Sequence, residues 1–374
     1  MEDFYRNTKI SITKMTAASD LPTISSTTIL SSDNVTLSAH QEQDIKTRAQ
    51  IEKIENEIKA NQKLTSDLIP ITELSNLYLD NNATTSTTIG GGDGGGGGVN
   101  KGFLQGCEYL ATKYTNYRAI RGDGNCYYRA FLYALVENLY NSNNDPSSSS
   151  ELKRISDYIN NSIDVVVQRG GYDRFAIETF HEEMVDLLST ITEEKDKKNT
   201  TDDDDSDSFS KIHNSLNEEN GTSDYCVWYL RVITSTILKS DPDRFVHYLN
   251  DGSGSDDPTS SSTNSSFNTY YTDVPTYCAR EIDPMGKECS MVGVLALAEA
   301  FQITVEIEYM DGKELDIKNN NNNNSNTLIK HSFGGRLHKE GGKDGASDGG
   351  NDELSSALCI TLLYRPGHYD ILYK

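Results

Sequence analysis

The sequence predicts an α+β fold in which a small central sheet is flanked by helices. Two kinds of pattern lead to this prediction. Apolar residues recur at helical spacing in several segments between about 125 and 301. Closer to the C-terminus, short segments are either alternating or continuously apolar, which is typical of strands. No internal repeat is present beyond homopolymer tracts.

The helices are predicted from the apolar periodicity and the residues that punctuate it. The segment that begins at Ser223 is apolar on nearly every side, which indicates a buried helix capped by Ser223. The others carry apolar residues on one side. In order, the predicted helices run over about 125–140, from after Pro146 through Ile163, and over 175–188, 223–238 and 291–301.

Three strands are expected in the last quarter of the chain. Ile303 to Tyr309 alternates apolar and polar residues, and 357–364 is a continuous apolar run of the kind found in buried strands. Pro366-Gly367 then turns the chain into a final short strand over 369–373.

Polar, low-complexity stretches divide the chain into regions. Residues 1–40 are predicted to be a disordered tail. Residues 41–80 form a helical N-terminal extension, with an amphipathic helix over 41–64. Residues 81–102 form a Gly-rich linker, and 103–374 form the folded domain. Within that domain three polar stretches are expected to be insertions that loop out from the surface, at about 191–220, 251–269 and 317–356.

Composition excludes several classes of protein. The 374 residues include 34 Lys and Arg against 57 Asp and Glu, a formal net charge of −23. An acidic chain is poorly suited to sequence-independent binding of nucleic acid or anionic membrane, and we expect neither partner. No apolar run of 18 residues and no signal peptide is evident. The six cysteines lack the spacing of a zinc ribbon or a disulfide framework. We expect no metal or other cofactor. We expect the chain in the cytoplasm or the nucleus.

The most informative segment is Arg121-Gly-Asp-Gly-Asn-Cys126, in which a Gly/Asp/Asn loop leads directly into a helix. A thiol in the first turn of a helix has its thiolate favoured, which a nucleophile requires. Amide groups of the loop can also stabilise an oxyanion. The alternative is a buried structural cysteine, and the position of Cys126 alone leaves both interpretations open.

A second candidate lies in the C-terminal segment Arg365-Pro-Gly-His368-Tyr-Asp370. Strand alternation places His368 and Asp370 on the same face. An imidazole oriented by a carboxylate can accept a proton from a thiol, which makes Cys126, His368 and Asp370 a testable triad. The other cysteines fit less well, because Cys226 and Cys359 are expected in the core.

These segments carry a resemblance to a known family. Asp123-Gly-Asn-Cys-Tyr-Tyr-Arg-Ala-Phe resembles the nucleophile motif of the OTU-domain cysteine proteases, and Tyr364 to Lys374 resembles the C-terminus of their otubain branch. Four segments between them are also similar to otubains: 222–225, 229–235, 281–288 and 305–310. The resemblance spans about 103–374 and implies an OTU-type, papain-like fold.

The resemblance also implies a function. By this resemblance the chain is expected to be an isopeptidase that removes ubiquitin without a metal. Lysine-48-linked ubiquitin chains are the expected substrate. Position by position, Cys126 is the nucleophile, His368 the general base and acid, and Asp370 the residue that orients His368. Asp123 takes the acidic position of the loop that supports the oxyanion. An alternative is a non-catalytic ubiquitin-binding protein that restrains ubiquitin-conjugating enzymes through the helix at 41–64.

Overall fold

The computed structural model describes residues 39–79, 101–141, 146–200, 206–249, 271–315, 327–334 and 358–374. The chain divides into two compact units, Met1–Glu57 and Ile58–Lys374. The described part of the first unit is helix α2 (Ala39–Asn61), whose last residues belong to the second. The predicted helix over 41–64 is therefore confirmed apart from its last turn. The predicted tail up to residue 38, most of the Gly-rich linker and the predicted insertion at 251–269 lie outside the described residues, and the last two residues of the tail belong to α2.

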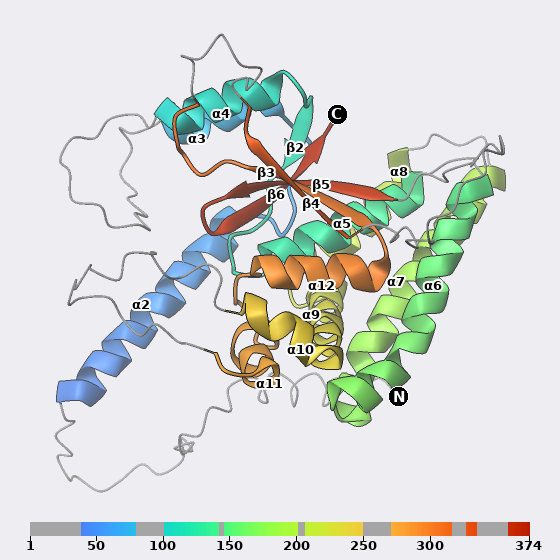
Figure 1. The fold of residues 1–374 in the computed structure, drawn as a ribbon. Helices are drawn as coiled ribbons and strands as arrows, with labels where there is room; N and C mark the ends of the chain where they lie inside the picture. Colours follow the sequence, from blue (N-terminus) through green and yellow to red (C-terminus); the bar gives the residue numbers. More distant parts are fainter. Residues whose placement is uncertain are drawn as a thin grey trace, which may run out of the picture. The chain divides into compact units, whose positions relative to one another are not determined.

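A six-stranded sheet forms the centre of the second unit (Figure 1), with the strand order β1-β2-β6-β5-β3-β4. Strands β3 and β5 run parallel, and the other neighbours are antiparallel. The strands are β1 (Ile69–Pro70), β2 (Asn116–Arg118), β3 (Thr304–Tyr309), β4 (Ile329–Gly334), β5 (Cys359–Arg365) and β6 (His368–Tyr373).

Three of these strands, β3, β5 and β6, are the predicted ones. Strands β1 and β2 have two and three residues, too few to show an alternating pattern. Strand β4 lies inside the predicted insertion at 317–356. It is an edge strand with mostly exposed side chains, including Ile329 and Lys330, so its sequence lacks the apolar alternation of a half-buried strand.

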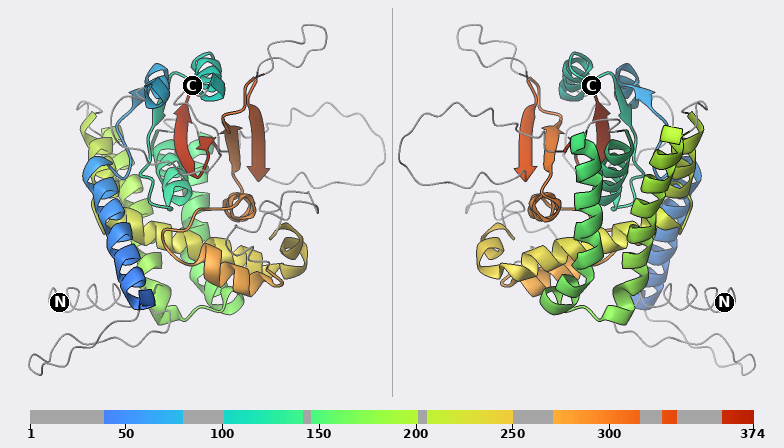
Figure 2. Two further views of the ribbon diagram at one scale, coloured as in Figure 1. Left: turned by 90° about the vertical axis from the view of Figure 1, so that its left-hand side faces the viewer. Right: turned by 90° about the vertical axis from the view of Figure 1, so that its right-hand side faces the viewer.

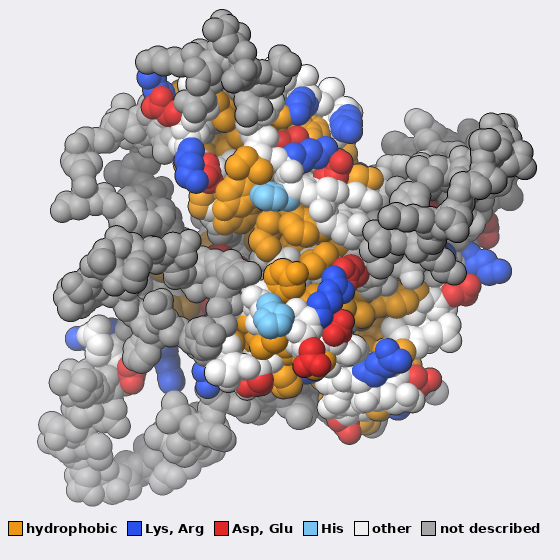
Figure 3. Space-filling view, viewed as in Figure 1, with side chains coloured by type: hydrophobic (Ala, Val, Ile, Leu, Met, Phe, Trp, Pro, Cys, Tyr) orange, Lys and Arg blue, Asp and Glu red, His pale blue; other side chains and the backbone are white. Residues whose placement is uncertain are grey.

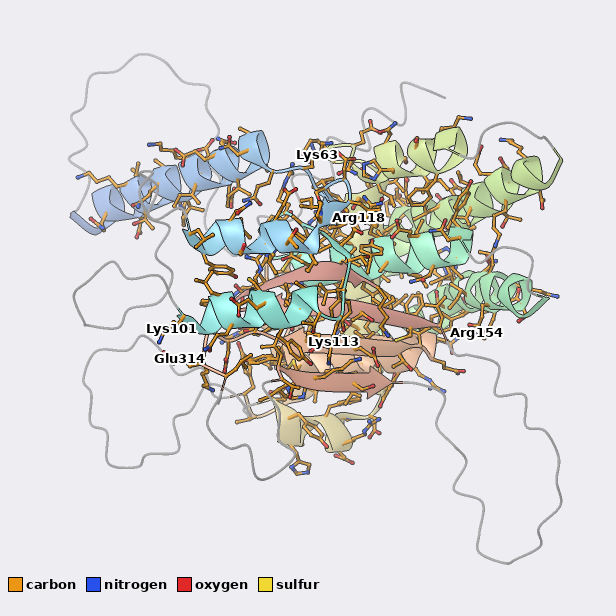
Figure 4. All side chains as sticks on the ribbon, turned by 90° about the horizontal axis from the view of Figure 1, so that it is seen from above. Lys63, Lys101, Lys113, Arg118, Arg154 and Glu314 are labelled. Carbon is orange, nitrogen blue, oxygen red and sulfur yellow. The ribbon has the colours of Figure 1, made fainter. Side chains whose placement is uncertain are left out.

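One face of the sheet is covered by η2 (Ile71–Ser75), α3 (Asn76–Leu79) and α4 (Lys101–Ala111). Leu74 and Leu110, both 0% exposed, share one apolar cluster with Leu363 and Leu372 of the sheet. Viewed from above, α4 lies across the strands between the labelled Lys101 and Lys113 (Figure 4). Residues 69–79 are thus part of the folded unit, whereas the sequence assigned them to a separate extension.

The other face is covered by α5 (Cys126–Asn141) and α12 (Met291–Phe301), with α9 (Thr222–Ser240) packed behind them (Figures 1 and 2). The rings of Phe131 and Phe301 join α5 to α12 with centroids 5.3 Å apart, and Tyr127 meets Tyr369 of β6 at 5.3 Å. The remaining elements complete this layer: α6 (Pro146–Val165), η3 (Val166–Gly170), α7 (Arg174–Thr200), α8 (Ser206–Leu216), α10 (Pro242–Phe245), η4 (Val246–Tyr248), α11 (Val274–Tyr277) and η5 (Cys278–Ile282).

The segment 191–220 differs from the exposed insertion predicted for it. Helix α7 continues to Thr200, α8 follows, and Ile191, Ile212 and Leu216 are all 1% exposed or less. Long polar runs separate these apolar residues in the sequence. Neighbouring helices bury them, so the segment itself shows no apolar periodicity. Ser223 is also not the N-cap of α9, because that position is Gly221. No helix among the described residues is long and apolar enough to cross a membrane.

Candidate active site

Cys126 is the first residue of α5 and is 2% exposed. The loop before it is folded tightly, because the Asn125 N–H donates to Oδ1 of Asp123 at 2.9 Å and Gly124 has a φ of +73°. Among the described residues, the amide N–H groups of Gly124 and Cys126 find no acceptor. The thiol therefore lies at the positive end of a helix beside amide donors that are free to bind a ligand.

The loop is held from behind by Arg231 of α9, a guanidinium that is 0% exposed. Its Nη2 donates to the Gly124 carbonyl at 3.1 Å and to Oδ1 of Asn125 at 2.8 Å. The same nitrogen donates to the Lys287 carbonyl, and Nη1 donates to the Ile282 carbonyl. Burial lowers the pKa of Arg231. This side chain joins the loop before Cys126 to the segment that follows η5.

His368 begins β6, directly after the turn at Gly367, which has a φ of +74°. Its Nε2 lies 2.9 Å from Oδ1 of Asp370, and its Nδ1 faces the loop before Cys126. Burial lowers the pKa of His368, but the hydrogen bonds to Asp370 and to the Cys126 thiol outweigh burial and raise it to about 9. The imidazolium form is therefore favoured at neutral pH.

Asp370 is 0% exposed and is fully committed to hydrogen bonds. Oδ1 also accepts the Ile120 N–H at 3.0 Å, and Oδ2 accepts Nε and Nη2 of Arg365 at 3.0 and 2.6 Å. Burial raises the pKa of Asp370, yet the Arg365 charge and the bond to His368 bring it down to about 2. The carboxylate is held ionised and oriented toward the ring.

Three of the four predicted site residues thus come together: Cys126, His368 and Asp370. The fourth, Asp123, faces another way, since its carboxylate pairs with Arg129 of α5 at 2.9 Å. Arg129 is 1% exposed and also binds Asp224. Asp123 consequently shapes the loop through Arg129 and the Asn125 amide.

Sequence reasoning missed two arginines of this site. Arg365 lies opposite His368 in the β5–β6 hairpin, which is how it reaches Asp370. Arg231 is a charged residue in a helix that is otherwise apolar on nearly every side. A buried charge in such a helix indicates a polar partner, and this pattern could have identified Arg231 from the sequence.

The remaining cysteines lack such surroundings. Burial raises the pKa of Cys107 and Cys278 to about 11 and that of Cys289 to about 12, and it also raises the pKa of Cys226 well above its ordinary value. Thiols of this kind stay protonated at neutral pH. Cys359 was predicted in the core, but it is exposed, because it is the first residue of β5.

Comparison with known proteins shows the family of the chain. A profile of the family described as Peptidase C65 Otubain matches residues 56–374. Ubiquitin thioesterase OTUB1 of Homo sapiens is 28% identical over 326 residues, which cover 87% of this chain and 89% of the relative. The otubain-like ubiquitin thioesterase of Caenorhabditis elegans is 27% identical over 286 residues, 73% of this chain and 74% of the relative.

Solved structures are similar as well. The structure described as h/ceOTUB1-ubiquitin aldehyde-UBC13~Ub matches with a TM-score of 0.60 and 23% identity, covering 89% of this chain and 99% of that chain. At this identity the likeness supports the fold, which is of the OTU, papain-like type. Because the family profile spans most of the sequence, the chain belongs to the otubain family, peptidase family C65, and is a cysteine-type deubiquitinating enzyme.

Proposed function

We propose that this enzyme hydrolyses isopeptide bonds to ubiquitin with Cys126 as the nucleophile, His368 as the general base and acid, and Asp370 as the residue that orients His368. The observation that carries this assignment is the order of the three groups: Nδ1 of His368 faces the loop that leads to Cys126, and Nε2 of the same ring lies 2.9 Å from the buried Asp370 carboxylate. Nucleophile, base and orienting carboxylate follow one another as the reaction requires.

The chemistry follows from these positions. The Cys126 sulfur attacks the carbonyl carbon of ubiquitin's C-terminal glycine, and the carbonyl oxygen becomes an oxyanion. The free N–H groups of Gly124 and Cys126 lie on the loop where such an oxyanion would accept hydrogen bonds. The C–N bond then breaks as His368 protonates the leaving lysine amine. Water attacks the resulting thioester, His368 accepts its proton, and the sulfur leaves as the thiolate.

The proposed substrate is lysine-48-linked ubiquitin, the linkage with which the otubain branch is associated. A panel of all diubiquitin linkages tests it, with Cys126→Ala as the inactive variant and the exposed Cys359→Ala as the matched control. We expect the lysine-48 linkage to be cleaved fastest by the natural chain and by Cys359→Ala. Cys126→Ala should cleave nothing while still binding ubiquitin. Turnover by Cys126→Ala would overturn the assignment of the nucleophile.

A second function is favoured by a separate observation on α2. Ile45, Ile51 and Ile54 are 53%, 50% and 42% exposed, and Ile51 and Ile54, three positions apart, lie on one side of the helix, where a partner can cover them. One structure of similar fold contains OTUB1 with ubiquitin aldehyde and UBC13~Ub. We therefore propose that α2 contacts a ubiquitin-conjugating enzyme and restrains it without catalysis.

The test is ubiquitin chain synthesis by a conjugating enzyme in the presence of Cys126→Ala. Inhibition should persist in that variant and disappear when Ile45, Ile51 and Ile54 are also changed to Asp. Inhibition that survives the three added charges would exclude α2 as the contact.

A further inference from the structure

Gln62 is the first residue after α2. Its backbone N–H, its backbone carbonyl and its side-chain oxygen all take part in hydrogen bonds. Its N–H donates to the Ile58 carbonyl in the last turn of the helix at 2.9 Å. Its own carbonyl accepts Nε and Nη2 of Arg121 at 2.9 and 2.6 Å. Its side-chain Oε1 accepts the N–H of Gly122 at 3.0 Å. One residue thus holds two consecutive residues of the loop that leads to Cys126.

These bonds belong to a longer pairing of the two segments. Arg121 donates its N–H to the Leu64 carbonyl at 3.1 Å, and Thr65 forms an antiparallel bridge with Ile120. Ile120 is the residue whose N–H binds the Asp370 carboxylate. Lys63 and Arg118, labelled in Figure 4, mark the segments that come together here. The loop is therefore supported on this side by residues 62–65 and from behind by Arg231.

The side chain of Gln62 lies close to the reacting groups. A Cβ built on Gly122 would be 3.9 Å from Oε1 of Gln62 and 3.8 Å from Nδ1 of His368. The carboxamide and the imidazole therefore approach the same point of the loop. Since the Gly122 N–H is occupied by Gln62, it is not an oxyanion donor, and its peptide plane is fixed relative to His368.

We propose that Gln62 is a positioning residue of the active site, which acts by holding the Gly122 peptide so that the loop amides and Cys126 keep their places opposite His368. This inference rests on the proposed catalytic role of Cys126. The carboxamide itself touches no reacting atom. Its loss therefore affects the rate of the chemical step more than the binding of ubiquitin.

The test compares Gln62→Met, which removes the acceptor at similar size, with Gln62→Glu, whose carboxylate keeps an oxygen acceptor. The matched control is Gln168→Met, an exposed glutamine of η3. All are measured in the full chain with the diubiquitin linkage that the natural chain cleaves fastest. Active sites are titrated with ubiquitin aldehyde, so that any unfolded fraction is excluded from kcat.

We expect Gln62→Met to lower kcat about tenfold, which corresponds to about 1.4 kcal/mol, with KM within about twofold of the natural value. This is the upper range for one neutral hydrogen bond. Gln62→Glu should retain kcat within about threefold, because a carboxylate is the stronger acceptor. Gln168→Met should be unchanged.

Three results would overturn the inference: an unchanged kcat in Gln62→Met, a change in KM alone, or an equal loss of kcat in the Met and Glu variants. Each of these leaves the proposed function standing if the natural chain and Gln168→Met cleave the substrate. Absence of cleavage by the natural chain, in contrast, would mean that the proposed function itself is wrong.

Discussion

The bond between Asp370 and His368 predicts how the enzyme responds to pH. In Asp370→Asn the residue keeps its shape and its Oδ1 acceptor for the Ile120 N–H, but it loses the charge that favours the imidazolium and the oxygen that accepts from Arg365. The pKa of His368, about 9 with Asp370 in place, should then fall to near its ordinary value of 6.5, because burial opposes the charged ring and only the Cys126 thiol still favours it. In this variant the His368 ring should lose its proton within the physiological pH range.

The size of the effect follows from these two values. At pH 8 a group of pKa about 9 is about 90% protonated, and one of pKa about 6.5 is about 3% protonated, a ratio of about 30. At pH 5.5 both are more than about 90% protonated. The loss of activity in Asp370→Asn should therefore be about 30-fold greater at pH 8 than at pH 5.5. Any loss of ring orientation adds a factor that does not vary with pH.

The assay is kcat/KM for diubiquitin between pH 5.5 and 9.5, which reports the titration of the free enzyme. The natural chain should lose activity on the alkaline side near pH 9, and Asp370→Asn more than two pH units lower. Asp243→Asn, an exposed aspartate of α10, serves as the matched control. If the ratio of natural to variant activity were constant with pH, Asp370 would act by orientation alone, and the reasoning from charge would be refuted.

Two further predictions concern the loop and the N-terminal segment. Gly124→Ala should lower kcat by at least tenfold without preventing folding of the sheet, because φ is +73° at this residue and a Cβ would lie 2.0 Å from the Gly286 carbonyl oxygen. Steady-state kinetics with active-site titration measures this change, and an unchanged kcat would contradict the prediction. Leu74→Ala should cost about 2–5 kcal/mol of unfolding free energy, measured by urea denaturation, because the side chain is 0% exposed in the cluster beneath α4. A loss below about 0.5 kcal/mol, typical of a surface position, would mean that residues 69–79 are a separate extension after all.

Much of the candidate site could be predicted from the sequence because its signals are local. A glycine-rich loop followed by an apolar helical pattern places Cys126 at a helix start. Strand alternation places His368 and Asp370 on one face, where their atoms lie 2.9 Å apart. The same periodicity predicted α5, α9, α12 and the strands β3, β5 and β6.

The tertiary structure alone decided which residues support that site. Gln62 reaches Gly122 across 60 positions of sequence, and Arg231 reaches Asn125 across 106. Pairings of this kind leave no periodic pattern, because they depend on where whole elements pack. The same reason explains why the helices within 191–220 and strand β4 were not predicted: their burial or pairing is provided by distant segments. The sequence by itself predicted the candidate reacting groups, because their signals are local, and the packing of the chain determined how they are held.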